Sequence, residues 1–135
     1  MAALTITAAS VAFVSGTKLD VTAGETITAG MLVYMDTADS NKYKGVDADV
    51  EASAVAAGIA LNGASSGQPL RIQTSGVITI GATIAVGTVY YAGLTAGNIG
   101  PLADIGPGDY VSIVGVGITA ANMRMIVLNS GVALP

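Results

Sequence analysis

Apolar and polar positions alternate in short runs along most of this chain, and glycine-rich turns separate the runs. The segment Leu70–Thr74 alternates with a period of two, which predicts a strand with Leu70 and Ile72 inward and Arg71 and Gln73 outward. The run Met31–Met35 is fully apolar, which predicts a strand covered on both faces. Short strands recurring roughly every 8–12 residues indicate an all-β sandwich or barrel.

One stretch of this pattern occurs twice. Gly24–Tyr34 recurs as Gly81–Tyr91, and the offset of 57 residues stays constant between residues 24–61 and 81–118. Eight positions carry the same residue in both copies, namely Gly24, Thr26, Ile27, Gly30, Tyr34, Asn41, Asp47 and Gly58 in the first. The constant offset favours an internal duplication over a chance match in a Gly-, Ala- and Thr-rich chain. Each copy reads as strand–turn–strand, with a positive φ expected at Gly30, and two copies predict two matching β layers.

The remaining segments complete the predicted domain. Residues 47–57 are expected to form one short helix, because Asp47 can act as its N-cap and Gly58 can end it. Residues 1–20 are interpreted as an N-terminal arm or edge strand, with Phe13 as an anchor; an ordinary first strand of the core is an equal alternative. Residues 21–135 are expected to form a single β domain.

The amino-acid composition indicates what surrounds this domain. Only 10% of the residues are charged and 52% are hydrophobic, against about 25% charged in an average soluble protein. Obligate interfaces are more apolar than ordinary surface, so we expect an oligomer or a subunit of a larger particle. The five Lys and Arg residues are scattered, which disfavours nucleic-acid binding. No apolar stretch reaches 18 residues, so a membrane helix is not expected.

The sequence offers little for catalysis or metal binding. It contains no His and no Cys, which excludes histidine-dependent catalysis, a cysteine nucleophile and a Cys/His metal site. Asp36, Asp39 and Asn41 lack the spacing of a calcium loop, so a solvated turn is the favoured interpretation. The pair Tyr90–Tyr91 could stack on a sugar, but an edge strand or a subunit interface is favoured. We expect neither an enzyme nor a bound metal or cofactor.

Four segments resemble a known family, the small capsid cement or head decoration proteins of tailed bacteriophages. The segments are Thr22–Gly30, Val55–Gly63, Gly67–Gly76 and Ile80–Tyr90, and the resemblance covers residues 20–131. The turn and strand at Ala23-Gly-Glu-Thr-Ile also resemble β-clip folds. The resemblance therefore implies a compact β-sandwich, barrel or β-clip-like domain built from two related halves.

The same resemblance implies a partner and a place of action. Such a protein would be made in the host cytoplasm, bind the major capsid protein on the outer surface of the shell as a homotrimer, and stabilise the mature virion. An N-terminal arm could add a strand to a sheet edge of the capsid protein. Candidate interface residues are Leu4, Ile6, Val11, Phe13, Val14, Tyr90 and Tyr91. The alternative is a phage head-fibre or tail-associated adhesion module that binds carbohydrate through Tyr90, Tyr91 and Tyr110.

Overall fold

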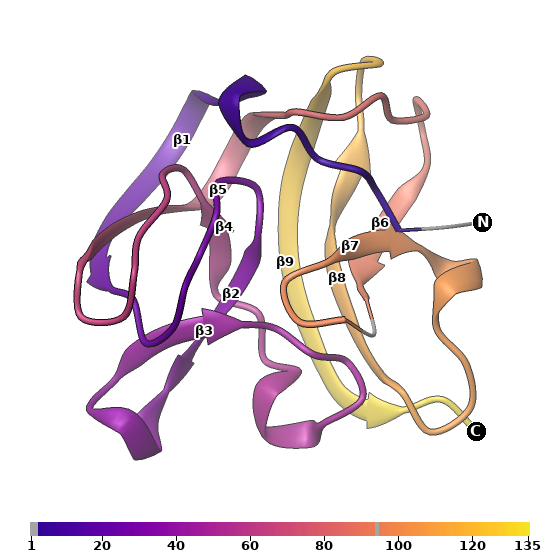
Figure 1. The fold of residues 1–135 in the computed structure, drawn as a ribbon. Helices are drawn as coiled ribbons and strands as arrows, with labels where there is room; N and C mark the ends of the chain where they lie inside the picture. Colours follow the sequence, from indigo (N-terminus) through magenta and orange to yellow (C-terminus); the bar gives the residue numbers. More distant parts are fainter. Residues whose placement is uncertain (1–2, 94) are drawn as a thin grey trace.

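The structure, a computed structural model, describes residues 3–93 and 95–135 apart from the side chain of Asp104. Its described residues form one nine-stranded antiparallel sheet that curls into a half-barrel (Figure 1). The all-β prediction is confirmed. The strands are β1 (Val11–Thr22), β2 (Leu32–Asp36), β3 (Lys42–Gly45), β4 (Gly58–Ala60), β5 (Pro69–Ile80), β6 (Val89–Ala92), β7 (Ile99–Pro101), β8 (Tyr110–Gly117) and β9 (Asn122–Ala133). Four single 3₁₀ turns accompany them: η1 (Ala8–Ser10), η2 (Thr37–Asp39), η3 (Glu51–Ser53) and η4 (Leu102–Asp104).

The order of the strands follows the internal repeat. The sheet runs β3-β2-β4-β5-β9-β8-β6-β7, and β1 pairs with the remaining edge of β5. An offset of 57 residues places β2 and β3 of the first repeat (residues 24–61) on β6 and β7 of the second repeat (residues 81–118). The same offset places β4 on the end of β8. The repeats therefore occupy the two ends of a single sheet joined through β5 and β9, rather than two separate layers.

Two apolar clusters form the core. The larger one lies between the repeats and includes Leu32 and Ile59 from the first together with Tyr90 and Met123 from the second half of the chain. The smaller one lies within the first half of the sheet and includes Val33. Leu32 and Val33 point to opposite faces of β2 and are both 0% exposed, so the prediction of a strand covered on both faces is confirmed for these two residues but not for Met35, which is 43% exposed.

The predicted helix at residues 47–57 is wrong, because only the single 3₁₀ turn η3 forms there. Val50 is extended, and the backbone after η3 bonds to partners outside the segment. The N–H of Ala57 donates to the carbonyl of Val33, and both backbone groups of Ala56 bond to the side chain of Asn129. These contacts replace the local hydrogen bonds that a helix would need.

The outward orientation predicted for Gln73 is also wrong. Gln73 is 0% exposed, whereas Arg71 on the same strand is exposed as expected. The Nε2 of Gln73 lies 2.9 Å from each of the carbonyl oxygens of Ser15, Ser75 and Val77, which share its two N–H groups as acceptors. The β1–β5 pairing is irregular near Ser15. The amide supplies partners to carbonyl groups that would be costly to bury without them, while its own Oε1 is buried without a partner among the described residues.

The turn at Gly30 has the backbone conformation expected from the sequence. Gly30 has a φ of +94° and its counterpart Gly87 has a φ of +78°, a region that favours glycine. A Cβ atom at Gly30 would lie 2.4 Å from Cγ2 of Ile6, while a Cβ at Gly87 would meet no atom within 4 Å. The N-terminal segment therefore packs over the first of these two turns and leaves the second open.

Candidate interaction surfaces

The N-terminal segment lies against its own domain. Leu4, Ile6 and Val11 are partly buried and pack on the larger core cluster. The N–H of Leu4 donates to the carbonyl of Ile99 at 2.8 Å, and the N–H of Thr7 donates to Gly81 at 2.8 Å. In Figure 1 this segment crosses the top of the molecule from the side of β7 to β1. Three of the predicted interface residues thus contribute to the stability of the isolated chain.

β1 presents an edge of the sheet. It pairs with β5 along its length, and in the described part of the chain no other strand pairs with its second edge. Val14 lies at a register shift between Phe13 and Ser15 and is half exposed. The ring of Phe13 is covered by the Nζ of Lys18, which lies 4.4 Å from its centroid and makes a cation–π contact. Backbone groups on the free edge of β1 are available to an added strand.

The two adjacent tyrosines have different environments. Tyr90 is 3% exposed, and its hydroxyl oxygen accepts a hydrogen bond from the N–H of Ala85 at 3.0 Å. Tyr91 is partly buried and is the cross-strand neighbour of Ile113, which in turn pairs with Leu128. Paired residues project from the same side of a sheet. Tyr91 therefore belongs to an apolar row, whereas Tyr90 is a core residue.

That row is part of a larger apolar surface, which we name the outer face. It consists of side chains on the exposed side of β6, β8 and β9: Val89, Tyr91, Ile113, Val116, Ile126 and Leu128, with the exposed Arg124 opposite Val116. Ile126 and Leu128 are 47% and 56% exposed. The sequence analysis named only Tyr91 among these residues. The alternation in Met123–Leu128, where Met123 and Met125 are buried, is the signal that could have found the others.

A second apolar surface lies beside β2 and β3. Met35, Tyr43, Val55 and Ala57 line a pocket of about 420 Å³, together with Thr37, Ala52 and Ala56. Met35 and Val55 are 43% and 54% exposed. We name it the Met35 pocket. Its lining is mostly hydrophobic, as is usual for a surface that receives an apolar partner.

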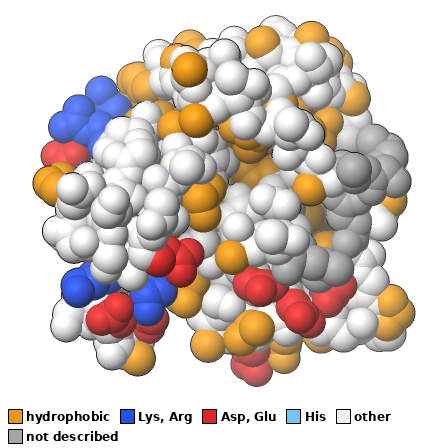
Figure 2. Space-filling model, viewed as in Figure 1, with side chains coloured by type: hydrophobic (Ala, Val, Ile, Leu, Met, Phe, Trp, Pro, Cys, Tyr) orange, Lys and Arg blue, Asp and Glu red, His pale blue; other side chains and the backbone are white. Residues whose placement is uncertain are grey.

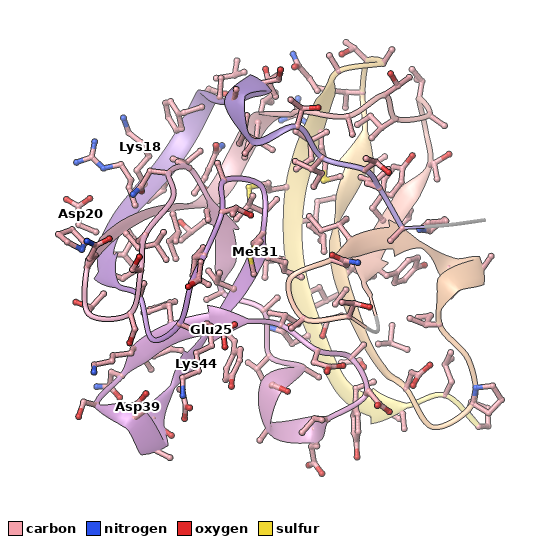
Figure 3. The ribbon with its side chains drawn as sticks, viewed as in Figure 1. Lys18, Asp20, Glu25, Met31, Asp39 and Lys44 are labelled. Atoms are coloured by element: carbon pink, nitrogen blue, oxygen red, sulfur yellow. The ribbon has the colours of Figure 1, made fainter. Side chains whose placement is uncertain are left out.

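Charged side chains are paired close to this pocket. The Nζ of Lys44 lies 2.8 Å from Asp36 and 3.1 Å from Asp39, and Figure 3 shows Lys44 and Asp39 side by side. The hydrogen bond from Lys44 lowers the pKa of Asp36, and both carboxylates raise the pKa of Lys44. The loop considered as a calcium site therefore holds a lysine ammonium group between its carboxylates. Within the described residues no group of three or more metal-binding side chains is assembled.

A second ion pair joins β1 to β5. The Nε of Arg71 lies 2.7 Å from Oδ1 of Asp20, and this hydrogen bond lowers the pKa of the Asp20 carboxyl group. Both side chains are largely exposed at the rim of a shallow hollow of about 520 Å³ whose lining also includes Asn62, Leu61 and Leu70. In Figure 2 charged side chains gather along the left and lower margins of the molecule, and apolar side chains are scattered over the rest of this side.

The comparisons with known proteins add no relative. No protein-family model matches the chain, and no curated protein matches it either. In the part of the chain that the structure describes, no helical segment has the length and apolar character needed to cross a membrane. Any functional conclusion therefore depends on the structure itself, in which two apolar surfaces and the free edge of β1 are the candidate interaction sites.

Proposed function

We propose that this chain is a structural subunit of a bacteriophage virion that binds the outer surface of the icosahedral capsid as a homotrimer and stabilises the mature shell. In this proposal its partners are the major capsid protein and further copies of itself. It needs no cofactor and catalyses no reaction. The proposal takes its family from the resemblance of residues 20–131 to capsid decoration proteins.

The observation that carries the proposal is the apolar outer face. Monomeric soluble proteins rarely expose contiguous apolar patches larger than a few hundred Å², and larger ones mark interaction sites. Here Val89, Tyr91, Ile113, Val116 and Leu128 lie next to one another on three adjacent strands. With only 10% of the residues charged, the chain has few side chains with which to keep such a surface in water.

The free edge of β1 supports a contact with the capsid protein. Strand addition to an open edge supplies affinity through main-chain hydrogen bonds, and alternate side chains supply specificity. Val14 and Leu19 on β1 are both about half exposed and would lie beside an added strand. Many identical weak contacts on a lattice then sum to strong binding.

Cosedimentation with capsids tests the proposal. The purified chain is mixed with expanded shells of the major capsid protein encoded nearest to it, and with unexpanded shells as the control. We expect saturable binding to the expanded shells and a higher temperature of shell disruption. Absence of binding, or binding without any gain in shell stability, would refute the function. A glycan array addresses the adhesion alternative, for which the burial of Tyr90 leaves no exposed tyrosine pair.

A further inference from the structure

The two repeats share a register but differ in what they bury. Leu32 and Ile59 are cross-strand neighbours in the first repeat, and both are fully buried in the larger core cluster. Their counterparts 57 residues later, Val89 and Val116, are again cross-strand neighbours. These two lie on the outer face and are partly exposed. The first repeat therefore buries against the rest of the chain the face that the second repeat leaves open.

The correspondence extends to the other apolar residues of that face that lie within the second repeat. The first-repeat residues that form or pack against the larger core cluster keep an apolar or aromatic counterpart in the second repeat. Five pairs are Leu32 with Val89, Tyr34 with Tyr91, Ala56 with Ile113, Ile59 with Val116, and Leu61 with Ile118. The other two are Val46 with Ala103 and Ala48 with Ile105, and Ile105 is itself buried in the larger core cluster. If this face were simply exposed to water, polar residues would be expected at these positions, alternating along each strand with apolar residues on the buried face. In the second repeat Val89, Ile113 and Val116 thus have the side chains of a buried face but are only partly buried in the described chain, while Tyr91 packs against the larger core cluster.

The surface on which this face of the first repeat packs also differs between the two repeats. In the second repeat, Ser112 and Val114 are buried beneath residues 46–56 of the first, and the Oγ of Ser112 donates to the carbonyl of Ala54. Their counterparts in the first repeat are Val55 and Ala57, which line the Met35 pocket. The surface that is covered in the second repeat is therefore an open apolar pocket in the first.

We propose that a second copy of this chain fills the Met35 pocket with its outer face. The contact repeats between two molecules the packing that joins the first repeat to the second within one molecule. Because the two surfaces are different, the interface is heterologous, so it generates a closed ring or an open filament. The inference deepens the proposed function by naming the faces that join the copies, and it rests on that function only in requiring self-association.

Engineered cysteines test the geometry of the contact directly. The contact between Ala54 and Ser112 within a chain corresponds to Val111 of one copy facing Val55 of the next. The sequence has no cysteine, so only introduced thiols can react. We expect a mixture of the Val55→Cys and Val111→Cys variants to form a covalent heterodimer with a short bis-maleimide linker. Efficient self-linking of either variant alone, or no linking in the mixture, would overturn the head-to-tail arrangement.

Charge substitutions test whether the contact holds the copies together. Val55→Glu and Leu128→Glu each place a charge on one of the two surfaces, and the matched control Val86→Glu changes a side chain that is 69% exposed on the loop before β6. All three positions are exposed, so the far-ultraviolet circular dichroism should stay unchanged. Because burying an unpaired charge is costly, we expect the first two variants to weaken self-association by at least about 10-fold in sedimentation velocity.

The outcomes separate this contact from the capsid function. Unchanged association of Val55→Glu and Leu128→Glu would refute the contact, even if the wild-type chain binds shells. A wild-type chain that stays monomeric both in solution and on shells would refute it as well. Conversely, a chain that associates through these faces but ignores shells would refute the capsid function and leave the contact standing.

Discussion

The side chain of Asn129 fastens the connection after η3 to the last strand of the sheet. Its Oδ1 accepts from the N–H of Ala56 at 2.8 Å, and its Nδ2 donates to the carbonyl of the same residue at 2.9 Å. Ala56 is 3% exposed, and its backbone groups have no other hydrogen bond in the described chain. The substitution Asn129→Leu keeps the volume of the side chain and removes both partners at once.

The expected loss of stability can be worked out from the N–H and the carbonyl of Ala56, which both lose their partner in Asn129→Leu. A buried backbone donor or acceptor that loses its hydrogen bond costs about 1–3 kcal/mol. Asn129 is only partly buried, so water can reach part of the site and the lower half of the range applies. We expect Asn129→Leu to reduce the free energy of unfolding by about 2–4 kcal/mol, a large share of the roughly 5–15 kcal/mol typical of a domain. The melting temperature should fall by roughly 5–15 °C.

Urea unfolding followed by circular dichroism measures this loss, at a protein concentration where the chain is monomeric. Leu128→Thr, on the opposite face of the same strand, is the control and should change the free energy by less than about 0.5 kcal/mol. Asn129→Asp keeps an acceptor for the N–H of Ala56 and loses the donor to its carbonyl. Protonation restores a donor, which raises the pKa of this carboxyl group in the folded state, so the variant should gain stability as the pH falls towards about 4 and keep that gain at lower pH. A loss below about 0.5 kcal/mol for Asn129→Leu would refute the reasoning.

Three further predictions concern single positions. Gly87→Ala should cost about 1–2 kcal/mol for its positive φ alone, whereas Gly30→Ala should cost more because its Cβ meets the N-terminal segment; equal losses in urea unfolding would contradict this difference. Because Lys44 lowers the pKa of Asp36, their ion pair stabilises the fold above the unfolded pKa of about 3.9 and is lost as the pH falls through the lower folded value. Asp36→Asn should therefore be less stable than wild type at neutral pH, and the difference should shrink as the pH falls through the lowered pKa of Asp36. A pH-independent difference would count against the pair. Gln73→Glu would place a carboxylate beside three carbonyl oxygens, so this variant should be unfolded at neutral pH or fold only in acid, as judged by circular dichroism. A variant that folds normally at neutral pH would contradict the role of Gln73 as a buried donor to these carbonyl groups.

Much of the fold could be predicted from the periodicity of the sequence. The apolar run of β2 has Leu32 and Val33 buried on opposite faces, as its composition requires. Leu70 and Ile72 point inward as their alternation indicates. The repeat predicts corresponding strands at a constant spacing, and the sheet contains them. These features depend on local patterns that a strand imposes regardless of its neighbours.

The failures come from contacts between distant segments. The acidic and alanine-rich sequence at residues 47–57 has a local preference for helix, but Ala56 is held by a side chain 73 residues away. Gln73 is drawn inward by carbonyl groups at the irregular β1–β5 pairing. The burial of Tyr90 and the exposure of Leu128 likewise depend on which segment covers each side of the sheet.

The unequal burial of the two repeats also affects how this protein can change over time. At Leu32 and Ile59 a polar replacement would open the interior of a single molecule, so few alternatives can persist there. At Val89 and Val116, which are partly exposed, the same replacement would leave the monomer folded and would affect only the contact between copies proposed above. A saturation library scored separately for folding and for assembly would thus show one pair of positions invariant in both screens and the other pair free in the first alone.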